Sequence, residues 1–393
     1  MGALTDHALG RNLRFFVTKE DAAYPGGRYG TDNQKHLATG DAAKVLSTAF
    51  EFNVARNDRM DARTTRSVME RITGKQEISW SCESYLLPVG STTEPDIGHM
   101  FEAAMGGAFG ASTAKTYKLS DTNALPTLRM ARTANGVFRE DLFGCWINEM
   151  SISGSGGEEP KVSFSGGAFN YALTGTGTCA SSSVTSTSLP LLSGDGVNFM
   201  VGSVISVNGD ETIVTSKSSA DTLVVKSGTY ANDEAIVPST YTETTGTASP
   251  INGIGGGLTL GGVTLPITSF DVTLANNNKP ISDEAFEKGT SDFISGYRSV
   301  TGTISVRARK DFIEEYAQRY VQLTATGDPT FSSVAVVITL GSTTGYKVVL
   351  TMAKCELNFG AIEVPEAEEA VLSIPFTALG TSGGDELTVA WNQ

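Results

Sequence analysis

Alternating apolar and polar residues mark a pair of strands near the start of the chain. Phe50, Phe52 and Val54 alternate with polar residues, and residues 77–83 repeat the alternation after a polar stretch that has no periodicity. Because successive side chains of a strand point to opposite faces, the pattern predicts a half-buried hairpin with a long projecting loop. The following segment DIGHMFEAAM places apolar residues at helical spacing before Gly106 and Gly107, which predicts a short helix.

The same order of patterns returns in the last third of the chain. Phe270, Val272 and Leu274 alternate with polar residues, a long polar loop follows, and a second alternating strand is expected over residues 300–309. A second helix is expected over residues 310–322, where three aromatic residues share one face. Further strands are expected around residues 334–340 and 346–352.

A repeated segment supports the reading of two copies. The 25 residues from Cys145 to Phe169 superpose without a gap on Cys355 to Leu379, at a constant offset of 210, so that two cysteines and two Glu-Glu pairs coincide. The copies differ by about eight residues in the projecting loop. We therefore predict a duplicated unit of hairpin, loop, helix and closing strand pair.

A block of different composition separates the copies. Residues 174–257 are rich in Thr, Ser and Gly at both ends, and apolar residues alternate in the centre around Asn208-Gly209-Asp210, a hairpin-turn signal. We predict a small inserted β-domain on flexible tethers, with disorder as the alternative. The predicted domains are residues 1–173, including an N-terminal arm, 174–257 and 258–393.

Composition agrees with a mainly β protein and argues against a nucleic-acid-binding surface. The chain of 393 residues is long enough for two or three domains, and charged residues make up only 18% of it beside 43 glycines. The net charge of −14 opposes phosphate binding, which depends on Lys and Arg. The second copy has a basic group, Arg307, Arg309 and Lys310, at the place where the first copy has the acidic residues Glu77 and Glu83. This difference in charge favours an interface between the two copies over contact with DNA.

The residues needed for catalysis or metal binding are not brought together by any motif. The three histidines are His7, His36 and His99, and no HExxH, GxSxG or P-loop motif is present. We expect His99 to be a structural residue of the first helix. The four cysteines, at positions 82, 145, 179 and 355, form no CxxC pair and are expected to be reduced, packed thiols. The sequence predicts no enzyme, no cofactor and no metal site.

Membrane and export signals are also missing from the sequence. No segment reaches the ~20 apolar residues of a membrane span, and the first residues lack the apolar run of a signal peptide. We expect the protein to be made in the cytoplasm and to stay there until it is assembled or released.

The order of these motifs resembles the tail tube proteins of long-tailed, siphovirus-like bacteriophages. The resemblance rests on ALGRNLRFFVTKE, on ITGKQEISWS followed by the FEAAMGG helix, on FGCWINEMSISGSGGEEPKVSFSGGAF, and on NNNKPISDEAFEKGTSDFISGYRSVTGTISV. It covers both copies and excludes the insert. It implies two tandem β-sandwich or barrel repeats, each with one helix, whose strands join those of neighbouring chains around a channel for DNA.

The resemblance also implies an assembly and its partners. The family usually forms hexamers of a one-domain subunit, so two repeats in each chain imply a trimeric, pseudo-hexameric ring, with the insert projecting outside. Implied partners are further copies of the chain, tape measure, tail terminator and tail tip proteins, and passing double-stranded DNA without specific binding. Rings would stack through the long loops, with candidates Asn57, Asp58, Arg59, Arg63, Arg66, Asn277, Lys279, Asp283 and Glu287. Candidates for the channel lining are Glu77, Ser79, Ser81, Glu83, Ser305, Arg307 and Arg309.

Two other classes of protein fit part of the pattern. A capsid decoration or baseplate protein would share the β-rich composition and the missing catalytic groups, but it does not need a duplicated unit. A carbohydrate-binding adhesin or enzyme is a weaker alternative, because the sequence offers neither a signal peptide nor a cleft of aromatic and carboxylate residues.

Overall fold

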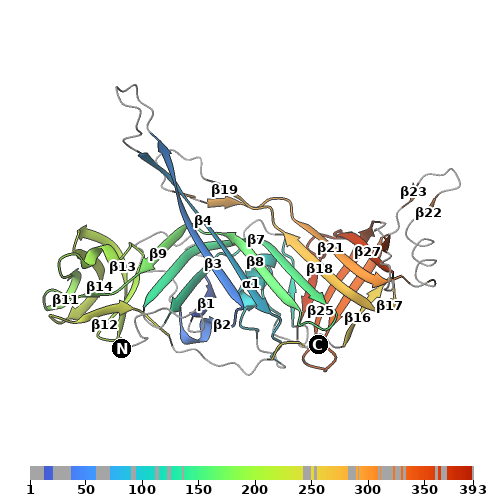
Figure 1. Ribbon diagram of the computed structural model, residues 1–393, viewed down its shortest axis with the longest axis horizontal. Coiled ribbons are helices and arrows are strands. Elements are labelled where there is room, and N and C mark those ends of the chain that lie inside the picture. The colour runs from blue at the N-terminus through green and yellow to red at the C-terminus, as the bar shows by residue number, and fades with distance from the viewer. Residues whose placement is uncertain are drawn as a thin grey trace.

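The computed structural model is mainly β, as the sequence predicts, with its strands arranged in layers along one long axis (Figure 1). The described residues are 13–20, 37–58, 71–89, 94–110, 115–121, 125–134, 137–241, 249–251, 255–281, 289–290, 292–308, 310, 322–323, 329–330, 333–358, 362–363 and 370–391.

One continuous antiparallel sheet, which we call the long sheet, runs through both predicted copies. Hydrogen-bonded neighbours follow one another in the order β3-β4-β8-β7-β18-β21-β27, and β25 and β26 both pair with β27 at the far end. Their bounds are β3 Ser47–Asp58, β4 Arg71–Tyr85, β8 Lys161–Gly167, β7 Phe138–Ser155, β18 Ile267–Ala275, β21 Ser299–Arg307, β27 Val371–Ala378, β25 Val348–Leu357 and β26 Ile362–Glu363.

Two flanking sheets cover one face of the long sheet. The first has the order β2-β1-β6-β7-β9 and the second the order β17-β16-β24-β25-β28-β5. Apolar residues of the long and flanking sheets form one buried cluster, which makes the body a two-layer sandwich. Bounds are β1 Leu13–Lys19, β2 Ala42–Ala43, β5 Thr116–Lys118, β6 Leu128–Ala134, β9 Asn170–Thr174, β16 Gly256–Leu260, β17 Val263–Leu265, β24 Val334–Leu340 and β28 Thr388–Ala390.

The strand order of the first half recurs in the second half. β3-β4-β8-β7 corresponds to β18-β21-β27-β25, and β1-β6-β7-β9 corresponds to β16-β24-β25-β28. β7 and β18 join the halves, and seven consecutive residue pairs run from Glu149–Ala275 to Ser155–Ser269. Within the chain the expected interface between acidic β4 and basic β21 is therefore wrong, because three other strands lie between them.

The repeated cysteines occupy matching places in this topology. Cys145 on β7 lies opposite Leu128 and Cys355 on β25 lies opposite Val334, and a register shift follows directly at both places. All four cysteines are buried and free, as the sequence predicts. Burial raises the pKa of Cys355 to about 12, so this thiol stays protonated at neutral pH.

Helix α1 (Gly98–Met105) fills the centre of the first half. Seven of its eight residues are buried, and Gly106 ends it in the left-handed conformation with φ 77°. Trp391, from the C-terminal end of the chain, is fully buried and packs edge-on against Phe101 of α1, with ring centroids 5.4 Å apart. The second predicted helix, over residues 310–322, falls almost entirely outside the described residues.

The strand of the predicted N-terminal arm belongs to the core. β1 pairs with β6 over seven residues, and Phe15, Phe16 and Val17 are at most 2% exposed. The expectation that this segment is an arm more than a core is wrong for β1, because its four central residues are all buried between neighbouring elements.

Residues 177–238 form a separate six-stranded sheet with its own apolar cluster. Its order is β10-β15-β12-β13-β14-β11, and Figure 1 places it at one end of the molecule. Asn208 and Gly209 make the turn between β12 and β13 with φ 53° and 86°, as a two-residue hairpin turn requires. Bounds are β10 Gly177–Thr178, β11 Ser183–Pro190, β12 Val204–Val207, β13 Asp210–Ser219, β14 Thr222–Tyr230, β15 Ala235–Pro238 and 3₁₀ helix η4 Asp195–Asn198.

The remaining short elements lie at the periphery. They are η3 Thr39–Asp41, β19 Lys279–Ile281 paired with β20 Asp292–Ile294, and β22 Gln322–Leu323 paired with β23 Pro329–Thr330. Within the described ranges, no helix has the length and apolarity needed to cross a membrane.

Replacing Trp391 by Ala should destabilise the protein by about 3–5 kcal/mol, since it removes a fully buried indole and leaves a cavity beside Phe101. The free energy of unfolding in urea measures the effect. Tyr297→Ala is the matched control, because Tyr297 is 97% exposed and its loss should change stability by under about 0.5 kcal/mol. Equal effects of both substitutions would contradict the docking of the C-terminal end under α1.

Candidate functional site: the exposed face of the long sheet

The face of the long sheet that points away from the core is lined by hydroxyl groups. Strand pairing places a row of residues side by side across seven strands, which we call the hydroxyl row: Glu83, Ser163, Ser151, Thr273, Thr301, Thr377 and Glu356. A second row runs Lys161, Ser153, Asp271 and Thr303, and a third runs Ser155, Ser269, Ser305 and Ser373. Both halves of the chain contribute to this surface.

Two carboxylates of this face, Asp271 and Glu83, contact hydroxyl or ammonium groups close by. The Ser151 hydroxyl donates to Asp271 Oδ2 at 2.8 Å, and Thr273 donates to Asp271 Oδ1 at 3.2 Å. Lys161 Nζ lies 3.4 Å from Glu83 Oε1. Most of the side chains in these rows carry short hydroxyl groups, and of the three rows the third borders a cavity, through Ser155 and Ser269. Among the described residues the rows contain no nucleophile–base pair, so their chemistry is that of a polar surface.

Six of the seven predicted lining residues lie on this face. Glu77, Ser79 and Ser81 are exposed on β4 beside the less exposed Glu83, and on β21 Ser305 is half-buried and Arg307 exposed. Arg309 lies outside the described residues. Strands β7, β8, β18 and β27 also contribute to this face, although none of their residues is among the predicted lining residues. The alternation of Ser or Thr with apolar residues in segments such as SISGS and KVSFSG is the sequence signal for their contribution.

The predicted stacking loops leave the body on one side. Asn57 and Asp58 are exposed at the end of β3, and the β3–β4 hairpin projects beyond the sandwich on the same side as β19 (Figure 1). Asn277 and Lys279 are exposed at the start of the second loop. Arg59, Arg63, Arg66, Asp283 and Glu287 lie outside the described residues.

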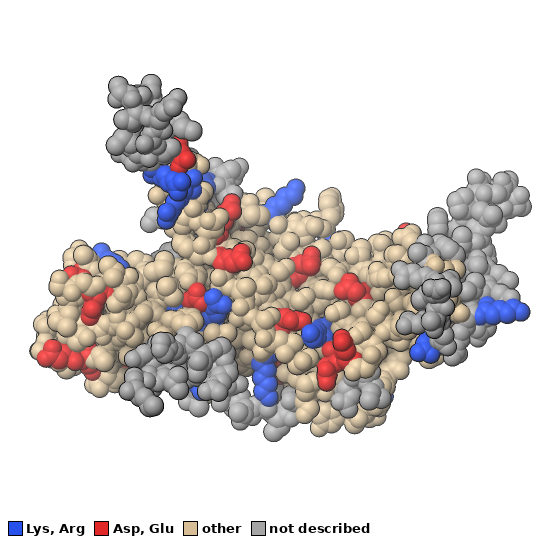
Figure 2. Space-filling model, in the orientation of Figure 1, with Lys and Arg blue, Asp and Glu red and all other residues tan. Residues whose placement is uncertain are grey.

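Charge is thinly spread over the molecule. Figure 2 shows acidic and basic side chains scattered over the visible face, with basic ones gathered at the projecting hairpin, where β3 and β4 carry exposed Arg56 and Arg71. Arg71 Nε donates to Asp58 Oδ1 at 2.8 Å across the hairpin. Such an exposed pair contributes little to stability.

A cluster of titratable groups ties the first strand to the helix. Lys19 Nζ on β1 lies 2.7 Å from Glu102 Oε2 on α1, and Glu94 accepts a hydrogen bond from the Tyr117 hydroxyl at 3.0 Å. Burial raises the pKa of Glu102, but contacts from His99, Lys19 and the Phe109 amide outweigh it and hold the pKa at about 2. His99, expected to be structural, has its Nδ1 3.9 Å from Glu102.

Three side chains of this cluster, Glu94, His99 and Glu102, form the one group among the described residues whose geometry could suit a metal ion. Ligand atoms of Glu94, His99 and Glu102 lie within 4.8 Å of one another. The ammonium group of Lys19 already neutralises Glu102, so the chain supplies a cation of its own. We therefore assign the cluster to the connection between β1 and α1.

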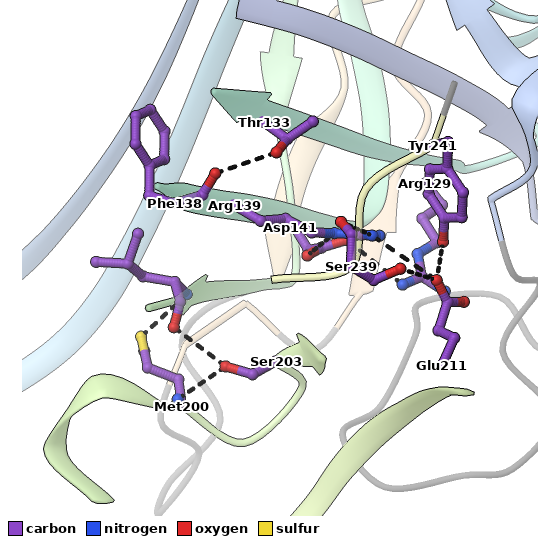
Figure 3. A network of polar contacts seen from close by, with 11 residues as sticks. Arg129, Thr133, Phe138, Arg139, Asp141, Met200, Ser203, Glu211, Ser239 and Tyr241 are labelled. Carbon is purple, nitrogen blue, oxygen red and sulfur yellow. Dashed lines mark hydrogen bonds and ion pairs between the residues drawn. The ribbon is translucent and has the colours of Figure 1, made fainter. Parts of the chain in front are cut away.

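A buried ion network attaches the insert to the first half of the body (Figure 3). Arg139 and Asp141 on β7 and Arg129 on β6 are at most 1% exposed, and Arg139 binds Asp141 through two hydrogen bonds of 2.8 Å. Arg139 Nη1 also donates to the Ser239 carbonyl at 3.0 Å and lies 4.0 Å from Glu211 of the insert. Buried charges are stable only when paired in this way.

Both connections of the insert contact the flanking sheet that contains β7 and β9. Glu211 accepts hydrogen bonds from the side chains of Ser239 and Tyr241 just after β15, and the Tyr241 ring lies under Arg139 at 5.1 Å. At the entry, Ser203 donates to the Leu173 carbonyl at 3.1 Å. These contacts connect the described ends of both expected tethers to the body, and residues 242–248 and 252–254 of the second tether lie outside the described residues.

Comparison with known proteins identifies one family. Residues 85–217, from the end of β4 through α1 and the β6–β9 strands into β13 of the insert, match the family model described as phage tail tube protein. No curated protein matches the chain. The match supports the resemblance to phage tail tube proteins; it reaches into the insert and does not include the second copy, so it does not test the siphovirus-like and duplicated features.

Replacing Asp141 by Asn should destabilise the protein by about 3–5 kcal/mol, because it leaves the guanidinium groups of Arg129 and Arg139 buried without their shared carboxylate. Chemical denaturation measures the change. Asp58→Asn removes the carboxylate of an exposed pair and should cost under about 1 kcal/mol. A loss for Asp141→Asn no larger than for Asp58→Asn would show that the network does not stabilise the body.

Proposed function

We propose that this phage tail tube protein, a structural component of the virion tail, polymerises as stacked rings into the channel through which DNA passes into the host. Three chains would form each ring, so that six repeats surround the channel. Its further partners would be the tape measure, tail terminator and tail tip proteins of a siphovirus-like tail. The observation that carries the proposal is the continuous long sheet, in which two repeats already stand side by side and present one hydroxyl-lined face.

The surface chemistry of that face suits a channel for DNA. Passage requires a wall that offers phosphate groups no concentrated positive charge, because Lys and Arg clusters bind DNA through counterion release. Most residues in the exposed rows of the long sheet carry hydroxyl groups, Asp271 accepts hydrogen bonds from two of them, and Lys161 is paired with Glu83. The net charge of −14 per chain adds repulsion toward phosphates.

The position of the insert supports a location outside the channel. Its contacts with the body reach Arg139 and Leu173, which lie on the parts of β7 and β9 that belong to a flanking sheet. The hydroxyl-lined face belongs to the opposite layer of the sandwich. We propose an external decoration, with domain limits at residues 1–173, 174–257 and 258–393.

Electron microscopy of the purified protein tests the proposed function. Hollow tubes with three chains and pseudo-six-fold symmetry in each ring are the expected result. Six chains in a ring would overturn the pseudo-hexamer, and trimers that never stack would favour a decoration or baseplate protein.

Deleting most of the insert should leave tube formation intact. Gly177 pairs with Ile236, so the ends of a deletion of residues 178–238 lie close together and can be joined by a short Gly-Ser linker. The deletion keeps Ser239, Tyr241 and the Arg139–Asp141 pair. Tubes of unchanged inner diameter and smaller outer diameter are expected in micrographs, and loss of assembly by a folded variant would contradict the external position.

A further inference from the structure

The second long loop takes a different course from the first. The first leaves the body as the projecting β3–β4 hairpin, whereas β19 extends from β18 across the first half towards β4 (Figure 1). β19 pairs with β20, and we call these two strands, residues 279–281 and 292–294, the strap. Between them Gly289 lies against β4, where an added Cβ would be 3.1 Å from the Gln76 carbonyl oxygen.

Three consecutive asparagines hold the chain where it leaves β18. Asn276 Nδ2 donates to the Ile147 carbonyl at 3.1 Å. Asn278 donates from Nδ2 to the same carbonyl at 2.9 Å and from its backbone N–H to Asn148 Oδ1 at 2.8 Å. Asn277 adopts the left-handed conformation with φ 50°, which Asn tolerates better than most residues. These contacts direct the chain over β7, the strand of the first half that borders the joint.

An aromatic dock on the first half receives the strap. The Phe293 ring of β20 stacks on Trp146 of β7, with ring centroids 5.5 Å and planes 22° apart, and its centroid lies 6.1 Å from that of Phe169. Trp146 is only 6% exposed. Gly167 of β8 makes room for the indole, because a Cβ there would lie 2.3 Å from Trp146 Cζ2. The dock is therefore built from Trp146, Phe169 and Gly167.

The matching described residues of the second half form no such dock. At the offset of 210, the three dock residues are replaced, in the same order, by Glu356, Leu379 and Thr377. Glu356 is exposed on β25, and the threonine carries the Cβ that close packing of an indole excludes. The asparagine segment also has no equivalent, because the aligned residues of the first copy are 56–58 and β3 continues through them as a strand.

We propose that the second long loop is a strap within the chain, which clamps the two repeats together across the β7–β18 joint and is thereby withheld from contacts between rings. The sequence alone predicts that both long loops stack. With the strap docked, only the first loop reaches a neighbouring ring, once for every two repeats. This division of roles rests on the proposed function, whereas the clamp is a property of the single chain.

Amide hydrogen exchange of the full-length protein, kept unassembled at low concentration, tests the clamp. Phe293→Ala should make the amides of the strap exchange about tenfold faster, because removal of the stacked ring favours local opening. Ile294→Ala is the matched control on the same strand: Ile294 is 60% exposed, and its loss should change the exchange by less than about twofold. A strap that exchanges at the rate of an unfolded chain in the wild type, or equal effects of both substitutions, would overturn the clamp.

A matched pair of shortened loops tests the division of roles in assembly. Strand pairing brings the ends of each loop together, at Asp58–Arg71 for the first and at Ile281–Asp292 for the second. The residues between either pair can therefore be replaced by an Asn-Gly hairpin turn. Circular dichroism checks that both variants fold.

Electron micrographs should show stacked tubes for the variant with the shortened second loop and isolated rings for the variant with the shortened first loop. Loss of stacking on shortening the second loop, or stacking that persists on shortening the first, would overturn the division of roles. Wild-type protein that forms no rings would instead overturn the proposed function, and the exchange measurement would still decide the clamp.

Discussion

The pairing of β7 with β18 is the contact on which the rest of the structure depends. Seven residue pairs fuse two sandwiches into one long sheet, so that two strand edges that would otherwise be exposed become the interior of a sheet. Asn276 and Asn278 hold the end of this joint through the Ile147 carbonyl and Asn148. The core shared by the two halves and the continuous polar face depend on this junction.

The joint also explains why one face of the sheet is uniform. Register across the junction places Ser151 beside Thr273 and Ser153 beside Asp271, so the alternation of β7 continues on β18 without a break. A shift of one residue would turn the apolar side chains outward and the hydroxyl groups into the core. The burial of Ile152 and Val272 at the joint therefore fixes the polar surface on the other side.

Buried charge has a different role at the insert. Arg129, Arg139 and Asp141 lie in the first half of the body, yet the carboxylate of Glu211 and the carbonyl of Ser239 complete their surroundings. Pairing a buried charge demands defined geometry, whereas apolar contact tolerates sliding. This network gives the insert a fixed attachment to the flanking sheet.

Periodicity, turn residues and the repeated cysteine segment determined much of the fold from sequence alone. The alternation around Phe50 and Phe270 predicted strands, and Asn208-Gly209 predicted a hairpin turn, because these signals depend on local backbone geometry. The exposed face of β4 could be predicted in the same way. Only the tertiary structure decided that β1 lies in the core, that β7 meets β18, and that Arg139 is buried beside the insert. These contacts join segments far apart in sequence, and the local pattern of a strand does not specify which edge it will find.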